Sequence, residues 1–483
     1  MSSQAIKPPK SAAQHQAERS AHWNAVAKKM RHWRGCGGYY HKRLTEIYGH
    51  VIPLGAKVLE IGCGNGDLLA NLKPQPGVGV DFSSEMIALA RERHPGLVFI
   101  DANADEVKLD EKFDFILLSD MLNEVWDVQA LFEHLKQYLN PQGRVLINVH
   151  SRLWELPLSL AVKLGLSKPG LGENWLTIPD ILNLMNLSGF EPVKTSHEIL
   201  FPIGIPLLAP FFNRFLVRFW PFNHLALTNF IVARLQPEAA KRQKQPKVSV
   251  IVPARNEAGN IENILTRIPQ MGSGTEIVFV EGHSSDNTFE AIQKGIARHS
   301  KLECQSMQQT GKGKGDAVRL GFSKATGDIL MILDADLTVP PEDLPRFYDA
   351  LAAGKGEFIN GVRLVYPMEE EAMRFFNLIG NKFFSLTFSW LLGQPVKDTL
   401  CGTKVLWKKD YERIADNRHV FGDFDPFGDF DLLFGAARLN FKIVDLPIRY
   451  RARTYGSTNI ERWKHGWLLL RMVFFAAKRI KFI

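Results

Sequence analysis

Short apolar runs alternate with helical patterns along most of this chain, and this alternation constrains its fold more than any other feature. The runs are KVLEIG, GVGVDF, FDFILLS and RVLINVH, and then KVSVIVPA, EIVFVEG, GDILMILDAD and GEFINGV. Apolar strands separated by helices predict parallel sheets with helices on both faces, which is the α/β class. With 483 residues, of which 45% are hydrophobic, the chain can form two such domains with proper cores.

A polar segment, QPEAAKRQKQP at residues 236–246, separates the two series of runs. Its composition and its prolines predict a linker. We therefore expect one Rossmann-like α/β domain over residues 21–235 and a second over residues 247–465. Residues 1–20 lack an apolar core and predict a disordered lead-in rather than a signal peptide. Residues 466–483 predict a short amphipathic tail at a membrane interface.

Charge and cysteine content narrow the function classes. Lys and Arg number 59 against 51 for Asp and Glu, and this excess fits an anionic partner such as a nucleotide, a phosphate or an acidic lipid. The basic residues do not interleave with aromatic residues as in RNA-binding motifs, so we expect no nucleic-acid partner. The four cysteines have no metal-ligand or paired spacing, which predicts a reduced, cytosolic setting. No segment has the apolar length that a transmembrane helix needs.

The segment VLEIGCGNG places three glycines at the end of the first predicted strand, before the helix-like DLLANL. Glycines let a backbone approach a ligand closely, and a helix N-terminus favours a negative group. The second predicted strand ends at Asp81, where an acidic residue in a Rossmann-like sheet lies beside ribose hydroxyls. These residues predict a nucleotide-type site.

The spacing G-x-G-x-G after an acidic residue resembles the class I S-adenosylmethionine-dependent methyltransferases over about residues 57–235. The resemblance implies S-adenosylmethionine as the cofactor. It assigns the methionine moiety to Glu60, Gly62, Gly64 and Gly66, the ribose to Asp81, the adenine to Asp101 and Ala102, and a place at the pocket to Asp120. Methyl transfer needs mainly alignment, so no catalytic base is expected. A domain that binds another nucleotide, or that has lost its cofactor, is the alternative.

The methyl acceptor is not identified by the sequence. His150, Trp154 and Trp175 follow the fourth predicted strand, in the region where such enzymes build substrate pockets, although core packing also explains them.

The segment MILDADLTVPPED places Asp334 and Asp336 at the end of a buried apolar run. In an extended strand these two side chains point to the same side. Two close carboxylates persist half protonated or around a cation, and oxygen ligands suit Mg²⁺ or Mn²⁺ bound together with substrate phosphates. Two solvated loop acids are the alternative.

Several ordered motifs around this pair resemble the family 2 inverting glycosyltransferases of the A-type fold. They include SVIVPARNEAGNIENIL, VEGHSSDNT, GKGKGDAVRLGFSKATGD and DTLCGTKVLWKKDY, and the similarity is greatest to the dolichyl-phosphate mannose synthase and polyprenyl-phosphate glycosyltransferase branch, over about residues 246–458. The resemblance implies a nucleotide-sugar donor, with nucleotide contacts from Pro253, Arg255, Glu257, Glu281, Asp286 and Lys314, and a metal held by Asp334 and Asp336 on the diphosphate. The family commonly has paired Asp where this chain has Glu281 and Gly282, so UDP and GDP both stay open.

A polyprenyl phosphate acceptor, with a second pKa of about 6, is mostly dianionic at pH 7 and needs cationic positioning rather than a base. IRYRARTYGST offers Arg449, Arg451 and Arg453, which strand alternation would place on one face. Arg453 matches the family position best, and Arg363 is a further candidate.

A saccharide hydroxyl acceptor would need a carboxylate base instead. Asp429 and Asp431 are the candidates, unless they only cap and fill the first turn of a helix. A non-catalytic binding module in one half of the chain is a further alternative to two enzymes.

Three apolar stretches predict contact with a membrane. Near residues 375–393, apolar and polar side chains form separate rows at helical spacing, as in an amphipathic helix, although packing on its own domain also explains this pattern. The tail joins apolar residues to Lys and Arg, which fits anionic lipid, and residues 199–222 are another lipid-facing candidate. We expect a bifunctional, peripheral enzyme on the cytoplasmic face of a membrane.

Overall fold

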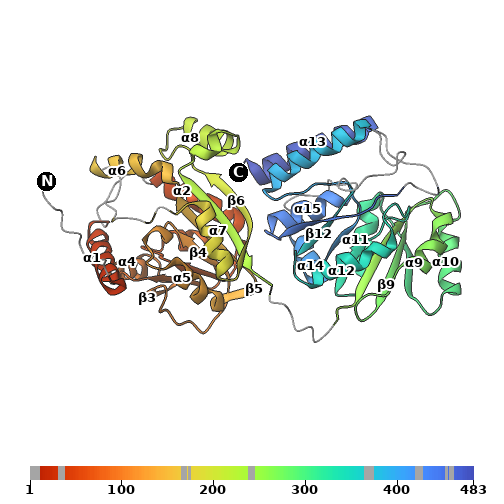
Figure 1. The fold of residues 1–483 in the computed structure, drawn as a ribbon, viewed down its shortest axis with the longest axis horizontal. Coiled ribbons are helices and arrows are strands. Elements are labelled where there is room, and N and C mark those ends of the chain that lie inside the picture. The colour runs from red at the N-terminus through yellow and green to blue at the C-terminus, as the bar shows by residue number, and fades with distance from the viewer. Residues whose placement is uncertain are drawn as a thin grey trace, which may run out of the picture. The chain divides into compact units, whose positions relative to one another are not determined.

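The computed structural model describes residues 11–30, 38–164, 171, 174, 176–237, 245–363, 375–418, 428–451, 455 and 462–482. The chain forms two compact units (Figure 1). Unit 1 comprises Met1–Gln236 with Phe482–Ile483, and unit 2 comprises Pro237–Lys481.

Unit 1 is built on a seven-stranded sheet with the order β3-β2-β1-β4-β5-β7-β6. The first five strands in this order pair in parallel, whereas β7 runs antiparallel to both β5 and β6. The strands are β1 Val58–Ile61, β2 Gly77–Asp81, β3 Val98–Asp101, β4 Phe113–Ser119, β5 Leu139–His150, β6 Phe190–Glu198 and β7 Thr228–Leu235.

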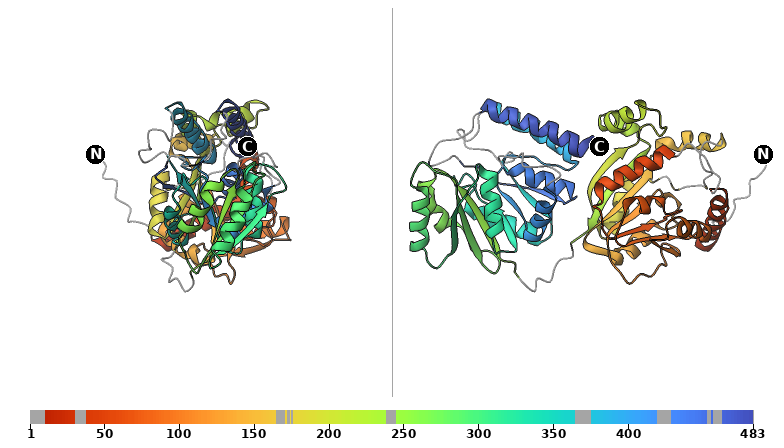
Figure 2. Two further views of the ribbon diagram at one scale, coloured as in Figure 1. Left: turned by 90° about the vertical axis from the view of Figure 1, so that its right-hand side faces the viewer. Right: turned by 180° about the vertical axis from the view of Figure 1, so that it is seen from behind.

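Helices cover both faces of this sheet (Figure 2). Alternate residues of β1 enter different apolar clusters: Leu59 packs with α5 and α7 on one face, and Val58 packs with α2, α3 and α4 on the other. The helices are α1 Ala12–Met30, α2 Gly38–Val51, α3 Asp67–Leu72, α4 Ser84–Arg93, α5 Val128–Leu135, α6 Glu155–Lys163, α7 Ile178–Leu187 and α8 Leu208–Pro210; short helical turns continue from α8 as η4 Phe211–Phe215, η5 Leu216–Arg218 and η6 Phe222–Leu225.

Unit 2 is built on a second seven-stranded sheet with the order β10-β9-β8-β11-β13-β12-β14. All pairs are parallel except those of β13, which runs antiparallel to β11 and β12. The strands are β8 Val248–Ala254, β9 Thr275–Glu281, β10 Glu303–Gln308, β11 Ile329–Ile332, β12 Phe358–Val362, β13 Lys404–Trp407 and β14 Ile443–Pro447.

The second sheet is also buried on both faces. Val250 of β8 packs with α9, α10 and α12, and its neighbour Ile251 packs with α11, α13, α15 and α16. The helices are α9 Ile261–Arg267, α10 Thr288–Arg298, α11 Lys314–Lys324, α12 Leu344–Ala352, α13 Phe375–Leu392, α14 Lys408–Asp416, α15 Asp429–Arg438 and α16 Arg462–Ala476.

The α/β class is confirmed, and every apolar run named above contains a strand. The expectation of parallel strands is confirmed for most pairs, but β7 and β13 run antiparallel to their neighbours, so both sheets are mixed. Residues 12–20 were expected in a disordered lead-in but form the start of α1, where Arg19 pairs with Glu124 at 3.2 Å. Among the described helices, none combines the length and the apolar character needed to cross a bilayer.

Candidate active sites

The glycine loop of unit 1 lies at the carboxyl end of β1 and leads into α3. Gly62, Gly64 and Gly66 all have positive φ, which glycine adopts without strain. A Cβ on Gly66 would lie 2.6 Å from the Phe99 ring, whereas a Cβ on Gly64 would meet no atom within 4 Å in the described part of the chain. The loop is therefore packed closely at one end, and its backbone at Gly64 faces open space.

Asp81, at the end of β2, holds this loop in place. Its carboxylate accepts hydrogen bonds from the backbone N–H groups of Gly64 and Ser83, both at 2.9 Å. Burial raises the pKa of Asp81 to about 6, and the two hydrogen bonds act against that rise. Asp101, at the end of β3, is the register partner of Asp81, and Ala102 donates its N–H to the Asp81 carbonyl at 3.1 Å. The predicted ribose and adenine residues thus lie side by side.

Glu60 of β1 is a buried carboxylate with an unused oxygen. Oε2 forms no hydrogen bond with the part of the chain that the structure describes. Burial raises the pKa of Glu60 to about 8, although a hydrogen bond from the Leu69 backbone opposes this effect. A buried acceptor of this kind is costly unless a donor satisfies it. The amino group of the S-adenosylmethionine methionine moiety is such a donor, so the residues present fit the cofactor.

A polar cluster lies at the carboxyl ends of β4 and β5. Tyr40 donates its hydroxyl to Asp120 at 2.9 Å and lies 3.2 Å from Nε2 of His150. Asn148 donates to Asp120 and accepts from Tyr48 at 2.6 Å. Asp120 has a positive φ of 53°, an uncommon conformation that turns the chain at the end of β4. Burial, followed by the charge of Asp120, raises the pKa of Tyr40.

The cluster contains the sequence candidates Asp120 and His150, together with Tyr40, which the sequence did not indicate. His150 is a member of it, beside the predicted cofactor residue Asp120. Trp154 instead donates its ring N–H to the Leu225 carbonyl at 2.9 Å, which ties two chain segments together. Trp175 lies outside the described residues. Tyr40 was missed by the sequence reasoning because it is 80 positions from Asp120 and belongs to no motif.

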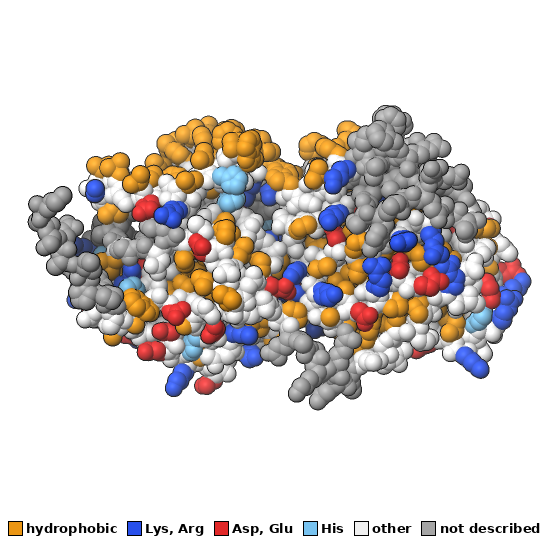
Figure 3. All heavy atoms as spheres, in the orientation of Figure 1, with side chains coloured by type: hydrophobic (Ala, Val, Ile, Leu, Met, Phe, Trp, Pro, Cys, Tyr) orange, Lys and Arg blue, Asp and Glu red, His pale blue; other side chains and the backbone are white. Residues whose placement is uncertain are grey.

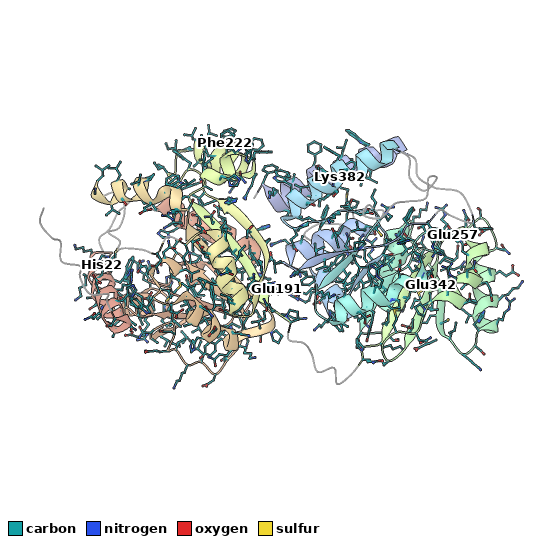
Figure 4. The ribbon with its side chains drawn as sticks, in the orientation of Figure 1. His22, Glu191, Phe222, Glu257, Glu342 and Lys382 are labelled. Carbon is teal, nitrogen blue, oxygen red and sulfur yellow. The ribbon has the colours of Figure 1, made fainter. Side chains whose placement is uncertain are left out.

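In unit 2, the loops after β8 and β9 form one cross-linked surface. Asn256 accepts from the Ser285 N–H at 2.8 Å, and the Glu257 N–H donates to Thr288 at 2.9 Å. Asp286 accepts from the Thr288 N–H at 3.0 Å, so it orders the start of α10. Pro253 lies within β8, and Arg255 is exposed on the loop that follows it. Figure 4 labels Glu257 at this edge of unit 2.

Glu281 ends β9 and is buried. It accepts hydrogen bonds from the Ser284 N–H at 2.5 Å and from the Gln308 side chain at 3.1 Å. Burial would raise its pKa, but these hydrogen bonds hold the pKa of Glu281 below the usual carboxyl value. The carboxylate is therefore ionised and already shapes the loop that carries Asp286.

Asp334 lies in a charged cluster beyond the end of β11. Lys314, the first residue of α11, lies 2.6 Å from Asp334 and 4.0 Å from Asp429. Lys404 is fully buried, 4.0 Å from the other oxygen of Asp429. Burial would raise the pKa of Asp334, but Lys314 keeps that pKa below its ordinary value. Asp334 is thus an ionised carboxylate in a largely enclosed setting.

The prediction that strand alternation orients Asp334 and Asp336 is wrong, because both residues lie beyond the strand. β11 ends at Ile332, and a turn follows in which Leu337 has a φ of 55° and donates its N–H to the Asp334 carbonyl. Asp336 accepts from the N–H and hydroxyl of Thr338, at 3.1 and 2.8 Å. The turn, rather than strand alternation, sets the directions of these carboxylates.

The donor set suits a metal that arrives with a diphosphate. The described residues contain no group of three or more His, Cys, Asp or Glu side chains placed to hold a metal by themselves. Mg²⁺ commonly binds through one or two carboxylates and completes its shell with water and substrate phosphates. Asp334 and Asp336 fit that requirement.

Asp429 and Asp431 have different surroundings, although they are two residues apart at the start of α15. Asp429 points toward Lys314 and Lys404, and its Oδ1 accepts no hydrogen bond from the described residues. Burial raises the pKa of Asp429, although both lysines oppose it. Asp431 pairs with Arg418 at 2.8 Å. Asp429 therefore belongs to the Asp334 cluster, whereas Asp431 is part of a separate ion pair.

The candidate phosphate-binding arginines are not equivalent. Arg363 donates from Nε and Nη2 to Asp398 at 2.7 and 2.9 Å, and both side chains are largely buried. Two of the five N–H groups of the Arg363 guanidinium are therefore used on Asp398, and a phosphate contact by Arg363 stays a prediction. Arg449 and Arg451 follow β14, which ends at Pro447, so strand alternation does not align them. Arg453 lies outside the described residues.

Family models match both units. Residues 30–195 match a methyltransferase domain, and residues 249–414 match glycosyl transferase family 2. The chain carries a methyltransferase domain followed by a family 2 glycosyltransferase domain. Both resemblances stated from the sequence are confirmed, and the chain is an enzyme with two transferase domains.

Curated relatives match the glycosyltransferase domain. The dolichol-phosphate mannosyltransferase of Pyrococcus furiosus is 30% identical over 220 residues, which are 44% of this chain and 59% of that protein. The undecaprenyl-phosphate 4-deoxy-4-formamido-L-arabinose transferase of Pectobacterium carotovorum is 34% identical over 111 residues, 22% of this chain and 34% of that protein. The matches thus span less than two thirds of either relative.

Solved methyltransferase structures are also similar in part. A putative methyltransferase in complex with the Trm112 activator of Haloferax volcanii has 16% identity and a TM-score of 0.35, covering 44% of this chain and 97% of that one. A possible histamine N-methyltransferase of Thermotoga maritima has 17% identity and a TM-score of 0.32, covering 46% of this chain and 95% of that one.

Proposed function

We propose that this chain is a bifunctional enzyme. Its second domain transfers a sugar, with inversion, from a UDP or GDP sugar to a polyprenyl phosphate, and its first domain transfers a methyl group from S-adenosylmethionine to an unidentified acceptor. The observation that carries the sugar-transfer proposal is the cluster of Asp334, Lys314 and Asp429 beyond the end of β11. The polyprenyl-phosphate substrates named for the relatives support the acceptor class.

The cluster supports donor activation by charge. Negative charge develops on the leaving diphosphate as the sugar C1–O bond breaks, and a divalent ion bound there neutralises it without proton transfer. Asp334 and Asp336 would hold that ion. Lys314 lies 2.6 Å from Asp334 and keeps that carboxylate ionised and in position. Asp334 and Asp429 in turn stabilise the positive charge of Lys314. Glu281 and Asp286 order the nucleotide side of the same sheet edge.

Basic residues near the aspartate turn support a phosphate acceptor. Arg451 donates its backbone N–H to the Thr338 carbonyl at 3.0 Å, and Thr338 also holds Asp336. The segment that carries Arg449 and Arg451 is thereby tied to the turn that holds Asp336. Guanidinium groups bind phosphate oxygens with two parallel hydrogen bonds.

A saccharide hydroxyl is the second candidate acceptor, and one observation favours it. Asp429 is a buried carboxylate with a raised pKa and a free Oδ1 among the described residues, as a general base requires. Its distance of 4.0 Å from two lysines also suits a purely electrostatic role.

A peripheral membrane position is supported by the unusual orientation of α13. Its serines face inward, where Ser385 and Ser389 donate to the Val396 carbonyl at 3.0 and 3.1 Å. Phe383 and Leu386 point outward and are 54% and 62% exposed. On α16, Trp467 and Phe474 are likewise exposed, whereas the opposite side packs into the domain. The side chains of residues 375–379, 381 and 462–466 lie outside the description.

Apolar side chains directed outward are costly in water and gain stability in a bilayer. Exposed Lys478 and Arg479 follow the end of α16 and suit anionic headgroups. We propose that these two helices hold the glycosyltransferase site at the surface where polyprenyl phosphate resides.

A panel of UDP and GDP sugars tests the glycosyltransferase proposal. The full chain is incubated with each sugar, Mg²⁺ or Mn²⁺, and vesicles that contain undecaprenyl or dolichyl phosphate. We expect an anionic glycolipid that the Asp334→Ala variant does not form. No product with any donor, together with unchanged nucleotide binding by Asp334→Ala, would refute the proposal.

Single substitutions separate the two acceptors. With a hydroxyl acceptor, Asp429→Asn abolishes turnover at unchanged donor affinity, whereas Asp431→Asn retains it. With a phosphate acceptor, Arg451→Ala or Arg453→Ala is the severe lesion, and Asp429→Asn is milder.

A further inference from the structure

The methyltransferase domain carries an exposed apolar surface of its own. Among the described residues, 14 of the 23 exposed large apolar side chains lie within residues 153–164 and 203–225. We name these two segments the apolar cap. Leu156, Leu207 and Trp220 are the most exposed of them, at 81%, 88% and 79%. Figure 3 shows hydrophobic side chains gathered over α6 and α8, and Figure 4 labels Phe222 at the same end of unit 1.

The cap is held firmly on its inner side. Asn213 is fully buried, and it accepts from the Phe201 N–H at 2.7 Å and donates to the Phe201 carbonyl at 2.6 Å. Arg218 pairs with Glu198 in a largely buried ion pair. Trp154 joins the start of α6 to Leu225. The outward direction of the apolar side chains is therefore fixed by internal contacts and is not the result of a loose loop.

The exposed charged side chains at the margin of the cap are basic, although Glu155, at the start of α6, is a partly exposed acidic residue within it. Residues 199–227 contain no Asp or Glu. Of their two arginines, Arg214 is exposed and pairs with Glu46 at 3.3 Å, whereas the Arg218 side chain is buried in its pair with Glu198 and does not reach the margin. Arg152 and Lys163, at the two ends of the other segment, are exposed. An apolar surface with basic residues at its margin matches an anionic bilayer, in which apolar side chains enter the lipid and basic side chains meet the headgroups. A soluble domain rarely exposes so much contiguous apolar surface without a partner.

The cap begins where the polar cluster ends. β5 ends at His150, and the next residue, Ser151, donates its N–H to the Leu227 carbonyl at 2.7 Å. Leu227 donates in turn to the Ile199 carbonyl at 2.8 Å, which closes the base of the cap. Thr228 then donates to the Tyr40 hydroxyl at 3.3 Å. The first cap segment therefore starts, and the second ends, close to the cluster of Tyr40, Asp120 and His150.

We propose that the apolar cap docks the methyltransferase domain on an anionic lipid bilayer and that the methyl acceptor reaches the His150 cluster from the lipid. The acceptor class, a membrane-borne molecule, rests on the proposed methyltransferase function, but the docking does not. The cap belongs to the methyltransferase unit, whereas α13 and α16 belong to the glycosyltransferase unit, so each domain would have its own contact with the membrane.

Hydrogen exchange on the full chain tests the docking, because it reports on each segment separately. Vesicles of equal parts of phosphatidylglycerol and phosphatidylcholine are compared with phosphatidylcholine vesicles and with no vesicles. We expect amide exchange in residues 153–164 and 203–225 to slow by about tenfold or more with the anionic vesicles only. Protection confined to residues 375–392 and 467–482 would overturn the proposal. Protection that needs no vesicles and rises with protein concentration would assign the cap to a second copy of the chain instead.

A pair of double variants supplies the control. Leu207→Ser with Trp220→Ser should remove the vesicle-induced protection of the cap. Leu54→Ser with Leu187→Ser changes two other exposed leucines of the same unit, at 83% and 61% exposure, and should leave that protection intact. Equal behaviour of the two double variants would contradict the proposal.

Calorimetry with S-adenosylmethionine on each protein separates docking from chemistry. Both double variants should bind the cofactor as the wild type does. A wild type that fails to bind it while the cap is still protected by vesicles would reject the methyltransferase proposal and the acceptor class, and would leave the docking in place.

Discussion

Replacing Gly402 by Ala tests the geometry of the proposed metal site with the addition of one methyl group. Gly402 follows the loop that Asp398 anchors by accepting the N–H groups of Leu400 and Cys401. A Cβ at Gly402 would lie 2.0 Å from Oδ2 of Asp334 and 2.4 Å from Nζ of Lys314. Ordinary contact begins near 3.4 Å, so the Asp334 oxygen would have to move by about 1.4 Å.

A displacement of about 1 Å at a catalytic group commonly costs on the order of 10²-fold in rate, which is about 2.7 kcal/mol of transition-state stabilisation. We expect a loss of at least that size in kcat/KM for sugar transfer to a polyprenyl phosphate, measured with the donor identified by the sugar panel. The free energy of unfolding should fall by only about 1–3 kcal/mol, as is usual for an overpacked site.

Gly380→Ala is the matched control. It adds the same methyl group in α13 of the same domain, where a Cβ would meet no atom of the described residues within 4 Å. This variant should retain wild-type kcat/KM. If Gly402→Ala retains it as well, Asp334 does not act where we place the metal, and the reasoning is refuted.

Three further predictions concern separate parts of the chain. Because the pKa of Glu60 is raised to about 8, this group is mostly protonated at pH 7, and binding of the S-adenosylmethionine amino group should release its proton. Calorimetry in two buffers of different ionisation enthalpy measures this release, which Glu60→Gln should lack. Equal proton release by both proteins would contradict the prediction. Asp398→Asn should lower the free energy of unfolding in urea by about 3–5 kcal/mol, against less than about 1 kcal/mol for Glu342→Gln in the exposed pair with Arg267. Burial would raise the pKa of Asp398, but Arg363 holds that pKa below its usual value. The stability that the ion pair adds is therefore present above the unfolded pKa, near 3.8, and is lost as pH falls through the lower folded pKa. A stability difference between the wild type and Asp398→Asn that does not change with pH would contradict the ion-pair explanation. Phe383→Ser with Leu386→Ser should weaken vesicle sedimentation yet change unfolding by only about 0.5 kcal/mol, and a cost of several kcal/mol would indicate that they belong to the core.

The sequence predicts the central strands of both sheets well and the outer strands poorly. Strands covered on both faces, such as β1 and β11, are continuous apolar runs that stand out from the helices. The edge strands β6 and β10 have partly exposed sequences rich in polar residues, FEPVKTSHE and ECQSMQ, which resemble loops. Direction is not encoded in an apolar run either, so antiparallel β7 and β13 could not be distinguished from parallel strands.

The candidate sites were predictable where a motif carries them. The glycine loop, Asp81 and Asp334 were found because short-range spacing places them at strand ends. Tyr40 and Lys404 were missed because only the tertiary fold brings them to Asp120 and Asp429. Helical periodicity separated the two faces of α13, but it did not reveal that the serine face is the buried one, since that depends on the Val396 carbonyl offered by a later segment.

The central claim is that one chain holds two independent transferase sites, and a paired binding measurement tests it most directly. Calorimetry is performed on the full wild-type chain, Gly66→Ala and Asp334→Ala, with S-adenosylmethionine and with UDP or GDP in the presence of Mn²⁺. A Cβ on Gly66 would overlap the Phe99 ring at a φ of 74°, so this variant should lose the cofactor only. Asp334→Ala should lose the metal-dependent nucleotide only. Binding of neither ligand by the wild type, or loss of both ligands in either variant, would contradict the account.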